Sequence, residues 1–502
     1  MRSLWLALSV AALSLARAAA PEVEGTWEAK ALVTKGTPFP GSAGQVLEFG
    51  EAYATETYFT FWARTGPRAN KDWTLFSWKD GKLTPIVQHY AAFVGPDSEK
   101  AKVFRTALSA NIGATPIHAG SHLLYLSASP TFLCVPHRVY AWDGEKLVKV
   151  LSRGDVLQVG ERRFEIHEAF VLAVGAGGKA LVFWESPWQR ARGWALHDGA
   201  RFTALWKEGD KPTGLRGVGI GNLRVQDYPD SLYIGAGPVG LPRLLEDGSL
   251  IAILPVAEAW TGRRALLRVW PDRAEEIAPR NPPDLVLAAA PQAVLASDQW
   301  TERVRYGEYK GYPRLLSIAA GKVQAHDALP LRELLADGAE LKPGAIIGGW
   351  AGITAAAFLG PDSLRALVTM RVSGRHGQGS SYPAIYFWDG EKLSSVVWED
   401  ALGLPPDAVR GLLRAHRKGP TEAKIRAIPG PAGGVIVTLP PLGGAPATWY
   451  VPSNSADGKL QPVPRFPVEG RVITLADVIS WKEPNEVLTQ TEEGYFLLRR
   501  TR

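Results

Sequence analysis

Short apolar segments that run into an aromatic residue and then a turn recur along the chain. The clearest copies are residues 75–83, 139–147 and 385–393, where Asp-Gly separates two apolar runs. Asp-Gly accepts the positive φ angle of a tight turn, and alternating side chains on either side face opposite sides of a sheet. The pattern therefore predicts β-hairpins. Weaker copies lie at 193–199, 266–272, 315–323 and 449–460.

A second kind of hairpin is predicted upstream of several of these copies. Residues 169–174 and 179–185 flank a Gly-rich turn, and similar pairs lie at 353–358 with 364–372 and at 424–428 with 435–439. Each repeat would then hold four short strands. Four-stranded units with turns at similar offsets are typical of the blades of a β-propeller, where radial repetition protects the sheet edges. An array of sandwiches is the alternative.

The two ends of the chain supply incomplete sets of strands. Residues 26–33 have no predicted strand before them, and the last strands, 487–491 and 495–499, have none after them. Pairing the first and last strands in one sheet would complete a blade and close the ring. We therefore expect an all-β, single β-propeller of eight four-stranded blades. Seven blades is the alternative, because 241–250 fits the inner hairpin of one blade or the outer hairpin of another.

Trp78, Trp142 and Trp388 each stand just before the turn of a clear copy. Their strands are expected to pack between adjacent sheets. A buried Trp contributes several times the ~0.8 kcal/mol of one CH₂ group. We therefore expect these three side chains in the core rather than against a ligand.

Two hairpins have the sequence Trp-Asp-Gly-Glu-Lys-Leu, at 142–147 and 388–393. Gly-Asp turns lie downstream of predicted hairpins at 154–155 and 209–210. This combination resembles a repeat class of exported bacterial β-propeller proteins with WD40-like architecture, many of unassigned function. The resemblance covers most of residues 21–502. It implies a fold and no functional residue. Because Gly-Asp recurs, the Arg-Gly-Asp at 153–155 is interpreted as a turn rather than an adhesion motif.

The first residues have the form of an export signal. Arg2 precedes an apolar run at 4–15, and small residues at 16–20 offer a cleavage site. The run is too short to span a bilayer comfortably. We therefore expect residues 1–20 to be a Sec-type signal peptide, residues 21–502 to be the propeller domain, and the mature protein to be secreted or periplasmic.

Composition narrows the classes of function. The 502 residues carry 56 basic and 50 acidic side chains, a formal net charge of +6, without a polybasic tail. Nucleic-acid binders concentrate Lys and Arg on one face or arm, so we expect no nucleic-acid partner. Cys134 is the single cysteine, so no intrachain disulfide forms. Its apolar neighbours predict a buried, inert thiol.

No motif assigns an activity. The absence of a Gly-x-Ser-x-Gly elbow weighs against a fused α/β-hydrolase, and the absence of His-Glu-x-x-His weighs against a zinc site. We expect no metal and no cofactor. The sequence leaves open whether the protein is an enzyme, and the missing motifs favour a non-enzymatic role. Paired carboxylates from distant segments would escape this search.

Loops at one rim are the best candidates for binding. In a four-stranded blade, the loop between the second and third strands and the loop between blades emerge on the same side. These loops are rich in Arg, Trp and Tyr. Arg binds carboxylate or sulfate through two N–H groups, and aromatic faces stack on sugars. The candidate ligand-binding residues, which we name the recognition rim, are Arg64, Arg68, Trp188, Arg190, Arg192, Trp260, Arg263, Arg264, Arg305, Tyr306, Arg375, His376 and Tyr382.

These features favour an exported, non-enzymatic scaffold, expected to be a monomer, that binds an acidic glycan or an acidic protein surface. An ordinary set of solvated loops is the competing interpretation of the recognition rim. The alternative function is a propeller enzyme acting on anionic polysaccharide. In a lyase, His376 or Tyr382 would be the base, whereas a glycoside hydrolase needs two facing carboxylates.

Export gives a direct prediction about the mature chain. Expression of the full sequence in a Gram-negative host should yield a protein whose new N-terminus lies between Ala19 and Pro21, as measured by intact mass and N-terminal peptide mapping. A cell-associated chain that retains Met1 through Ala20 would contradict the signal-peptide interpretation.

Overall fold

The protein is described from a computed structural model of all 502 residues. The residues that the structure describes are 26–40, 44–67, 73–88, 92–93, 102–103, 117–118, 122–128, 138–159, 161–175, 178–215, 219–220, 242–257, 263–278, 283, 285–299, 302–305, 308–310, 313–319, 322–327, 346–347, 351–360, 363–373, 381–395, 426–431, 434–438, 448–453, 461–462, 466–468, 471–473, 477–482, 485–491 and 493–501. The predicted signal peptide and Cys134 lie outside them.

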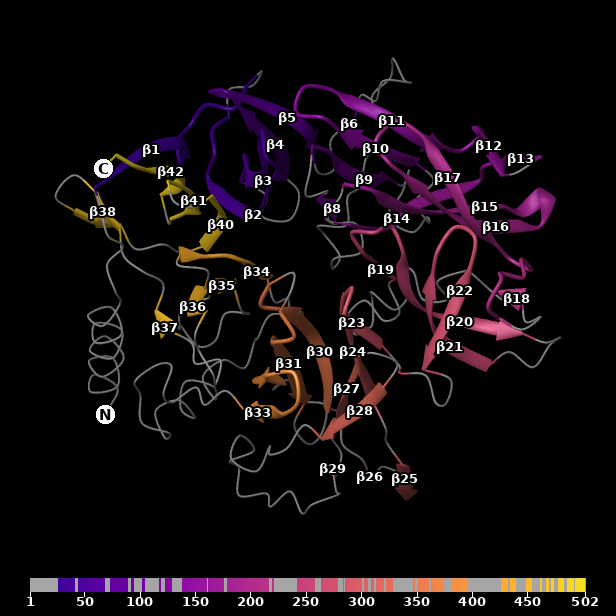
Figure 1. Cartoon of the computed structure of the whole chain (residues 1–502). Helices are drawn as coiled ribbons and strands as arrows, with labels where there is room; N and C mark the ends of the chain where they lie inside the picture. The colour runs from indigo at the N-terminus through magenta and orange to yellow at the C-terminus, as the bar shows by residue number, and fades with distance from the viewer. Residues whose placement is uncertain are drawn as a thin grey trace. The chain divides into compact units, whose positions relative to one another are not determined.

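The fold is all-β, and its blade sheets are those of a β-propeller. In the described ranges, eight sheets are blades. In seven of them the strands follow chain order across the sheet, and the eighth joins the first strand of the chain to strands from its end. Two compact units contain them, residues 34–291 and residues 1–33 with 292–502, and each unit is described by itself. Figure 1 shows the labelled strands.

The unit of residues 34–291 contains four complete blade sheets. Their strands are β2 (Glu48–Ala54), β3 (Phe59–Arg64), β4 (Trp73–Lys79) and β5 (Lys82–Gln88); β8 (Ile117–His118), β9 (Leu124–Ala128), β10 (Arg138–Trp142) and β11 (Leu147–Ser152); β14 (Glu168–Val174), β15 (Ala180–Ser186), β16 (Ala191–His197) and β17 (Phe202–Lys207); and β18 (Gly219–Ile220), β19 (Arg243–Leu244), β20 (Leu250–Ala257), β21 (Arg263–Val269) and β22 (Ala274–Ala278).

The other four sheets involve the rest of the chain. Their strands are β23 (Leu285–Ala290), β24 (Ala293–Gln299), β27 (Pro313–Ala319) and β28 (Lys322–Asp327); β30 (Ala351–Phe358), β31 (Ala366–Ser373), β32 (Ser381–Trp388) and β33 (Leu393–Ser395); β34 (Arg426–Pro429), β35 (Val435–Thr438), β36 (Thr448–Val451) and β37 (Gln461–Pro462); and β1 (Trp27–Thr34), β38 (Phe466–Val468), β39 (Arg471–Ile473), β40 (Asp477–Lys482), β41 (Glu486–Gln490) and β42 (Gly494–Arg500).

Smaller elements decorate the blades. These are the pair β6 (Ala92–Phe93) and β7 (Lys102–Val103), the hairpin β12 (Val156–Val159) and β13 (Arg162–Glu165), the 3₁₀ turn η2 (Pro187–Gln189), and a sheet of β25 (Glu302–Arg305), β26 (Glu308–Lys310) and β29 (Ile346–Ile347). Across the described ranges, no helix has the length and apolar character needed to cross a membrane.

The predicted fold class is confirmed, with eight blades rather than seven. All seven predicted hairpins of the Asp-Gly pattern form the third and fourth strands of their sheets. The ambiguous segment 241–250 contributes β19 and the start of β20, so it belongs to the inner hairpin of its blade. Local turn chemistry was therefore sufficient to place the third and fourth strands of these seven sheets.

The predicted pairing of the chain ends is also confirmed. β1 lies between β42 and β38, in the same sheet as β41 and β40 (Figure 1). The N–H of Thr501 donates to the carbonyl of Thr26 at 2.8 Å, which continues the ladder to the last residues. The side chains of Trp27 and Phe466 meet edge to face within this sheet's core. The first strand is thus held by the C-terminal ones.

The Asp-Gly turns are of two kinds, only one of which matches the prediction. At 80–81 both Asp80 and Gly81 have positive φ, as a two-residue hairpin turn demands. In the loops 143–146, 198–201 and 389–392 only the Gly has positive φ, and the Asp carboxylate accepts N–H groups two and three residues later. These bonds lower the pKa of Asp198 and Asp389. There, Asp caps the turn.

The Gly-Asp turns after the fourth strands share one geometry. Gly154 and Gly209 have positive φ, and the carboxylates of Asp155 and Asp210 accept the N–H of the residue three before them at 2.8 Å. The same carboxylates pair with Lys149 and Lys207. The Arg-Gly-Asp at 153–155 is therefore a structural turn, as predicted.

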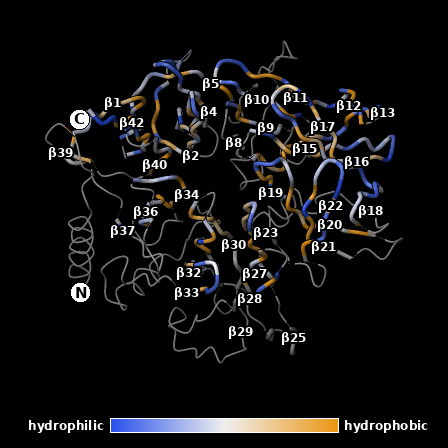
Figure 2. Tube along the Cα trace, viewed as in Figure 1, coloured by the Kyte–Doolittle hydropathy of each residue, from blue (hydrophilic) through white to orange (hydrophobic). Residues whose placement is uncertain are grey.

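The core lies between neighbouring sheets, so their middle strands are buried on both faces. Every residue of β15 is buried, and Figure 2 shows hydrophobic segments along the strands and polar ones at many turns. Trp142 and Trp388 are buried as predicted. Trp78 is only half-buried and packs on Phe59 of its own sheet, so its predicted place between sheets is wrong. A two-residue turn follows Trp78, at the exposed end of the hairpin.

Hydrogen bonds join neighbouring sheets at the same structural position. The hydroxyl of Tyr58 donates to the carbonyl of Trp142 at 2.8 Å, and Trp206 Nε1 donates to the carbonyl of Trp270 at 2.8 Å. Trp142 ends the third strand β10, and Trp270 directly follows the third strand β21. Gly144 belongs to this contact, because a Cβ there would lie 2.7 Å from the Tyr58 ring.

His197 occupies the equivalent strand end in another sheet. Its Nδ1 lies 3.0 Å from the Tyr125 hydroxyl and accepts the N–H of Gly199 at 3.3 Å. Burial lowers the pKa of His197 below its ordinary 6.5, and the nearby Asp198 only partly opposes that shift. The neutral imidazole is therefore the form that fits the folded protein.

The protein should lose stability as the pH falls below about 6.5, since the unfolded His197 takes up a proton before the folded one does. Urea-denaturation midpoints at pH 7.5 and 5.5 measure the loss. A His197→Gln variant, which cannot titrate, should lose less than the wild type. A His122→Gln variant, which removes a 62% exposed histidine, is the control. An identical loss in His197→Gln and wild type would exclude His197 as the cause.

Candidate functional site

The hairpin β12–β13 stands between two blades, after β11 and before β14. Its register places Val156 opposite Glu165 and Gln158 opposite Arg163, so these four side chains share one face. Leu157 and Phe164 occupy the other face and are buried. The inner face thus anchors the hairpin, and its outer face presents apolar, amide and charged groups together.

The edge of β13 is bound by a side chain from another blade. Gln189 of η2 accepts the N–H of Glu165 at 2.9 Å and donates Nε2–H to the carbonyl of Arg163 at 2.7 Å. Its Oε1 also accepts the hydroxyl of Ser186 at 2.8 Å. One amide thereby replaces a neighbouring strand. It fixes the loop between β15 and β16 against the hairpin that connects two blades.

Trp188 is presented to solvent by this fixed loop. Its side chain is 79% exposed, and its one recorded ring contact is an edge-to-face approach to His167 with centroids 6.4 Å apart. Arg190 follows in the left-handed region, with φ of 49°, and its N–H donates to the carbonyl of Pro187. For a residue other than Gly, the left-handed backbone conformation costs about 1 kcal/mol or more. The loop therefore carries both exposed apolar surface and backbone strain.

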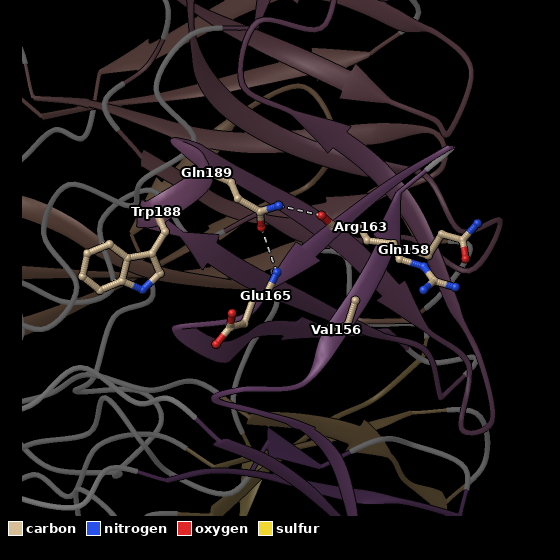
Figure 3. A pocket seen from close by; sticks show the side chains of 6 residues that line it. All are labelled: Val156, Gln158, Arg163, Glu165, Trp188 and Gln189. Atoms are coloured by element: carbon tan, nitrogen blue, oxygen red, sulfur yellow. Dashed lines mark hydrogen bonds between the residues drawn. The ribbon is translucent and has the colours of Figure 1, made fainter.

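The hairpin β12–β13 and the loop between β15 and β16 line an open pocket with a volume of about 700 Å³. Figure 3 shows Gln189 bonded to β13, with the Trp188 ring on one side and Arg163 and Gln158 on the other. Val156, one of the lining residues, is 61% exposed. The described lining residues are Val156, Gln158, Arg163, Glu165, Trp188 and Gln189, which we name the Trp188 pocket.

Two described arginines of the recognition rim are bound within their own sheets. Arg64 Nε donates to Glu48 at 2.9 Å. Arg192 Nε donates to the buried Glu185 at 2.8 Å, and its Nη1 lies 3.4 Å from Glu208. Arg190, by contrast, is exposed, and its guanidinium has no bonding partner in the part of the chain that the structure describes. Among the rim residues whose side chains the structure describes, Arg190 and Trp188 are thus the exposed ones.

The other rim residues are placed only in part. Arg263 and Arg264 begin β21, Arg305 ends β25 and Tyr382 lies in β32. Their side chains are outside the description. Arg68, Trp260, Tyr306, Arg375 and His376 lie outside the described residues altogether.

The sequence reasoning missed the hairpin that supplies most of the pocket. Residues 156–159 and 162–165 alternate between buried and exposed positions around a Gly-Glu turn, which is a hairpin signal. The strands are short and lack the aromatic Asp-Gly pattern of the repeat. Val156, Gln158, Arg163 and Glu165 were therefore not among the candidates, and neither was Gln189.

Comparison with protein-family models gives no match, and neither does comparison with the curated proteins. Among solved structures, the chain is similar to the β-propeller domain of the Trilobed protease from Pyrococcus furiosus, with 10% identity, coverage of 82% of this chain and 94% of that chain, and a TM-score of 0.34.

Two further structures show similar levels of likeness. For the Pyrococcus horikoshii acylaminoacyl peptidase the identity is 10%, coverage is 78% of this chain and 57% of that chain, and the TM-score is 0.32. For the Penicillium chrysogenum alpha-L-arabinanase complexed with arabinobiose the identity is 11%, coverage is 73% of this chain and 99% of that chain, and the TM-score is 0.28. At such TM-scores these likenesses carry no argument about function.

The two bound arginines give a stability prediction. Arg192→Ser leaves the buried Glu185 carboxylate without its partner and should lower the free energy of unfolding by about 2 kcal/mol. Arg64→Ser breaks a pair whose carboxylate is 53% exposed and should cost under about 1 kcal/mol. Urea denaturation measures both. Equal losses in the two variants would show that the Arg192 contacts are no stronger than a surface pair.

Proposed function

We propose that the protein is an exported, non-enzymatic β-propeller that binds glycan chains through the Trp188 pocket and the neighbouring Arg190. The observation that carries the proposal is a Trp side chain left 79% exposed on a loop whose backbone is fixed by Gln189. An exposed aromatic on a rigid support binds at little entropic cost, because the bound arrangement already exists.

The chemistry of the lining suits a saccharide. The Trp188 ring offers an apolar plate for the C–H face of a sugar, and Gln158, Arg163 and Glu165 offer donors and acceptors for hydroxyl groups. Arg163 and Arg190 together outnumber Glu165, so acidic substituents on the glycan would add to the affinity. The strained φ of Arg190 supports a role in binding, since strain of this kind clusters at functional sites.

Binding is favoured over hydrolysis by the carboxylates in the pocket. Glycoside hydrolysis needs two carboxyl groups on either side of the scissile bond. Among the described lining residues, Glu165 alone carries a carboxyl group. A polysaccharide lyase with His376 or Tyr382 as its base remains the alternative proposal, and assay of acidic polysaccharides for unsaturated products distinguishes it from simple binding.

The remaining expectations from the sequence belong to the same proposal. They are removal of residues 1–20 on export, a single propeller domain at 21–502, a secreted or periplasmic location, a monomeric state, and no nucleic-acid partner. Kinship with exported bacterial Trp-Asp-Gly propellers is likewise proposed. Its support is the recurring capped turn at residues 143–146 and 389–392.

Trp188→Ala should weaken glycan binding at least about tenfold, since an exposed aromatic anchor contributes more than about 1.4 kcal/mol. It should change the free energy of unfolding by less than about 0.5 kcal/mol, because the side chain is exposed. The measurement is a glycan array followed by calorimetric titration of the best neutral and acidic ligands. Val148→Ala, at another exposed apolar position in the same unit, is the matched control.

Arg190→Ser separates the acidic contribution from the stacking contribution. It should weaken acidic ligands more than neutral ones and reduce the salt dependence of binding. Wild-type affinity in Trp188→Ala, or no glycan bound by the wild type across the array, would contradict the proposed function.

A further inference from the structure

A second feature of the residue 34–291 unit is a half-buried arginine on the short strand β19. Arg243 is the first residue of β19, which pairs with β20 through Arg243 and Ile251. β19 lies against β14 and against β23, the first strands of the adjoining sheets (Figure 1). Arg243 therefore projects from an innermost strand, among strands that hold equivalent places in their own sheets.

The guanidinium of Arg243 has few contacts. Its Nε is closed off from solvent and has no hydrogen-bond partner in the structure. Its Nη2 lies 3.4 Å from the carbonyl of Val286, at the long limit of a hydrogen bond. Among the described residues, no carboxylate pairs with it. Burial lowers the pKa of Arg243, yet a guanidinium stays charged at neutral pH.

Another arginine of the same sheet, Arg268, has the partners that Arg243 lacks among the described residues. Arg268 of β21 donates to Asp247 at 2.9 Å and to Ser249 at 3.1 Å, and it lies over the Trp270 ring. Asp247, in the turn that follows β19, is therefore already engaged. Removing a guanidinium from water without a carboxylate or comparable acceptors is costly. Stability alone does not account for Arg243.

We propose that Arg243 anchors a binding site for an oxyanion group of a small ligand, either a carboxylate or a phosphate or sulfate group. Arg243 is half-buried, so part of the side chain still meets solvent and can be reached by a ligand. An oxyanion offers several acceptor lone pairs and binds the planar fork through parallel N–H···O bonds. It would supply a negative charge and accept from the terminal N–H groups of the fork, since Nε itself is closed off from solvent. The site is separate from the Trp188 pocket and does not depend on the proposed glycan binding.

The test compares unfolding temperatures in different salts. Wild type, Arg243→Met and Arg268→Met are titrated with sodium phosphate, sulfate and citrate, each matched to sodium chloride at equal ionic strength. A ligand that binds only the folded state raises the apparent unfolding temperature by mass action. At least one oxyanion should raise it for wild type and Arg268→Met beyond the chloride control. The salt that gives the largest rise in unfolding temperature identifies the preferred oxyanion.

Arg243→Met should show no such rise, and in chloride it should unfold at or above the wild-type temperature, because an unpaired charge has been removed. Arg243→Lys keeps the charge but loses the fork, so it should fold and show a reduced rise. An oxyanion rise in Arg243→Met equal to that of wild type would overturn the proposal. So would the absence of any oxyanion-specific rise in wild type, or failure of both Arg243 variants to fold.

Discussion

Packing between neighbouring sheets within each unit is the constraint on which the rest of the structure depends. A strand such as β15, buried along its whole length, is stable only if apolar side chains cover both faces of its sheet. Adjacent sheets supply that cover, and hydrogen bonds from Tyr58, Tyr125 and Trp206 hold the strand ends that carry the repeated turns. The end strands meet the same requirement, because β1 is joined to β42.

Because the core lies between the blade sheets, the connecting loops can carry exposed side chains. The blades provide a rigid support whose stability does not rely on the loop between β15 and β16 or on the outer face of β12–β13. Those segments can therefore hold an exposed Trp188, a left-handed Arg190 and a mixed polar surface. Gln189 joins the two segments and gives the pocket a defined shape. Stability and recognition are thus assigned to different residues of the same unit.

The sequence predicted whatever depends on local chemistry. Asp-Gly at 143–144 and 389–390 located the hairpins, because an Asp cap and a Gly of positive φ act within a few residues. Trp188 and Arg190 were predicted in a loop for the same reason. The ion pairs of Arg192 were not predictable, since Glu185 lies on the neighbouring strand β15, Glu208 directly follows β17, and both meet Arg192 only through sheet register. The burial of Arg243 Nε without a hydrogen-bond partner depends likewise on packing between sheets. The hairpin β12–β13 was missed because short strands give a weak periodic signal.

Hydrogen–deuterium exchange with and without a bound glycan tests most directly whether a rigid blade scaffold presents a preformed pocket. The account predicts that backbone amides of β15, β16 and β20 exchange most slowly in the free protein, at the rate of global unfolding. Ligand should then slow exchange chiefly at residues 156–165 and 186–190. Rapid exchange in those central strands, or ligand protection confined to other segments, would contradict it.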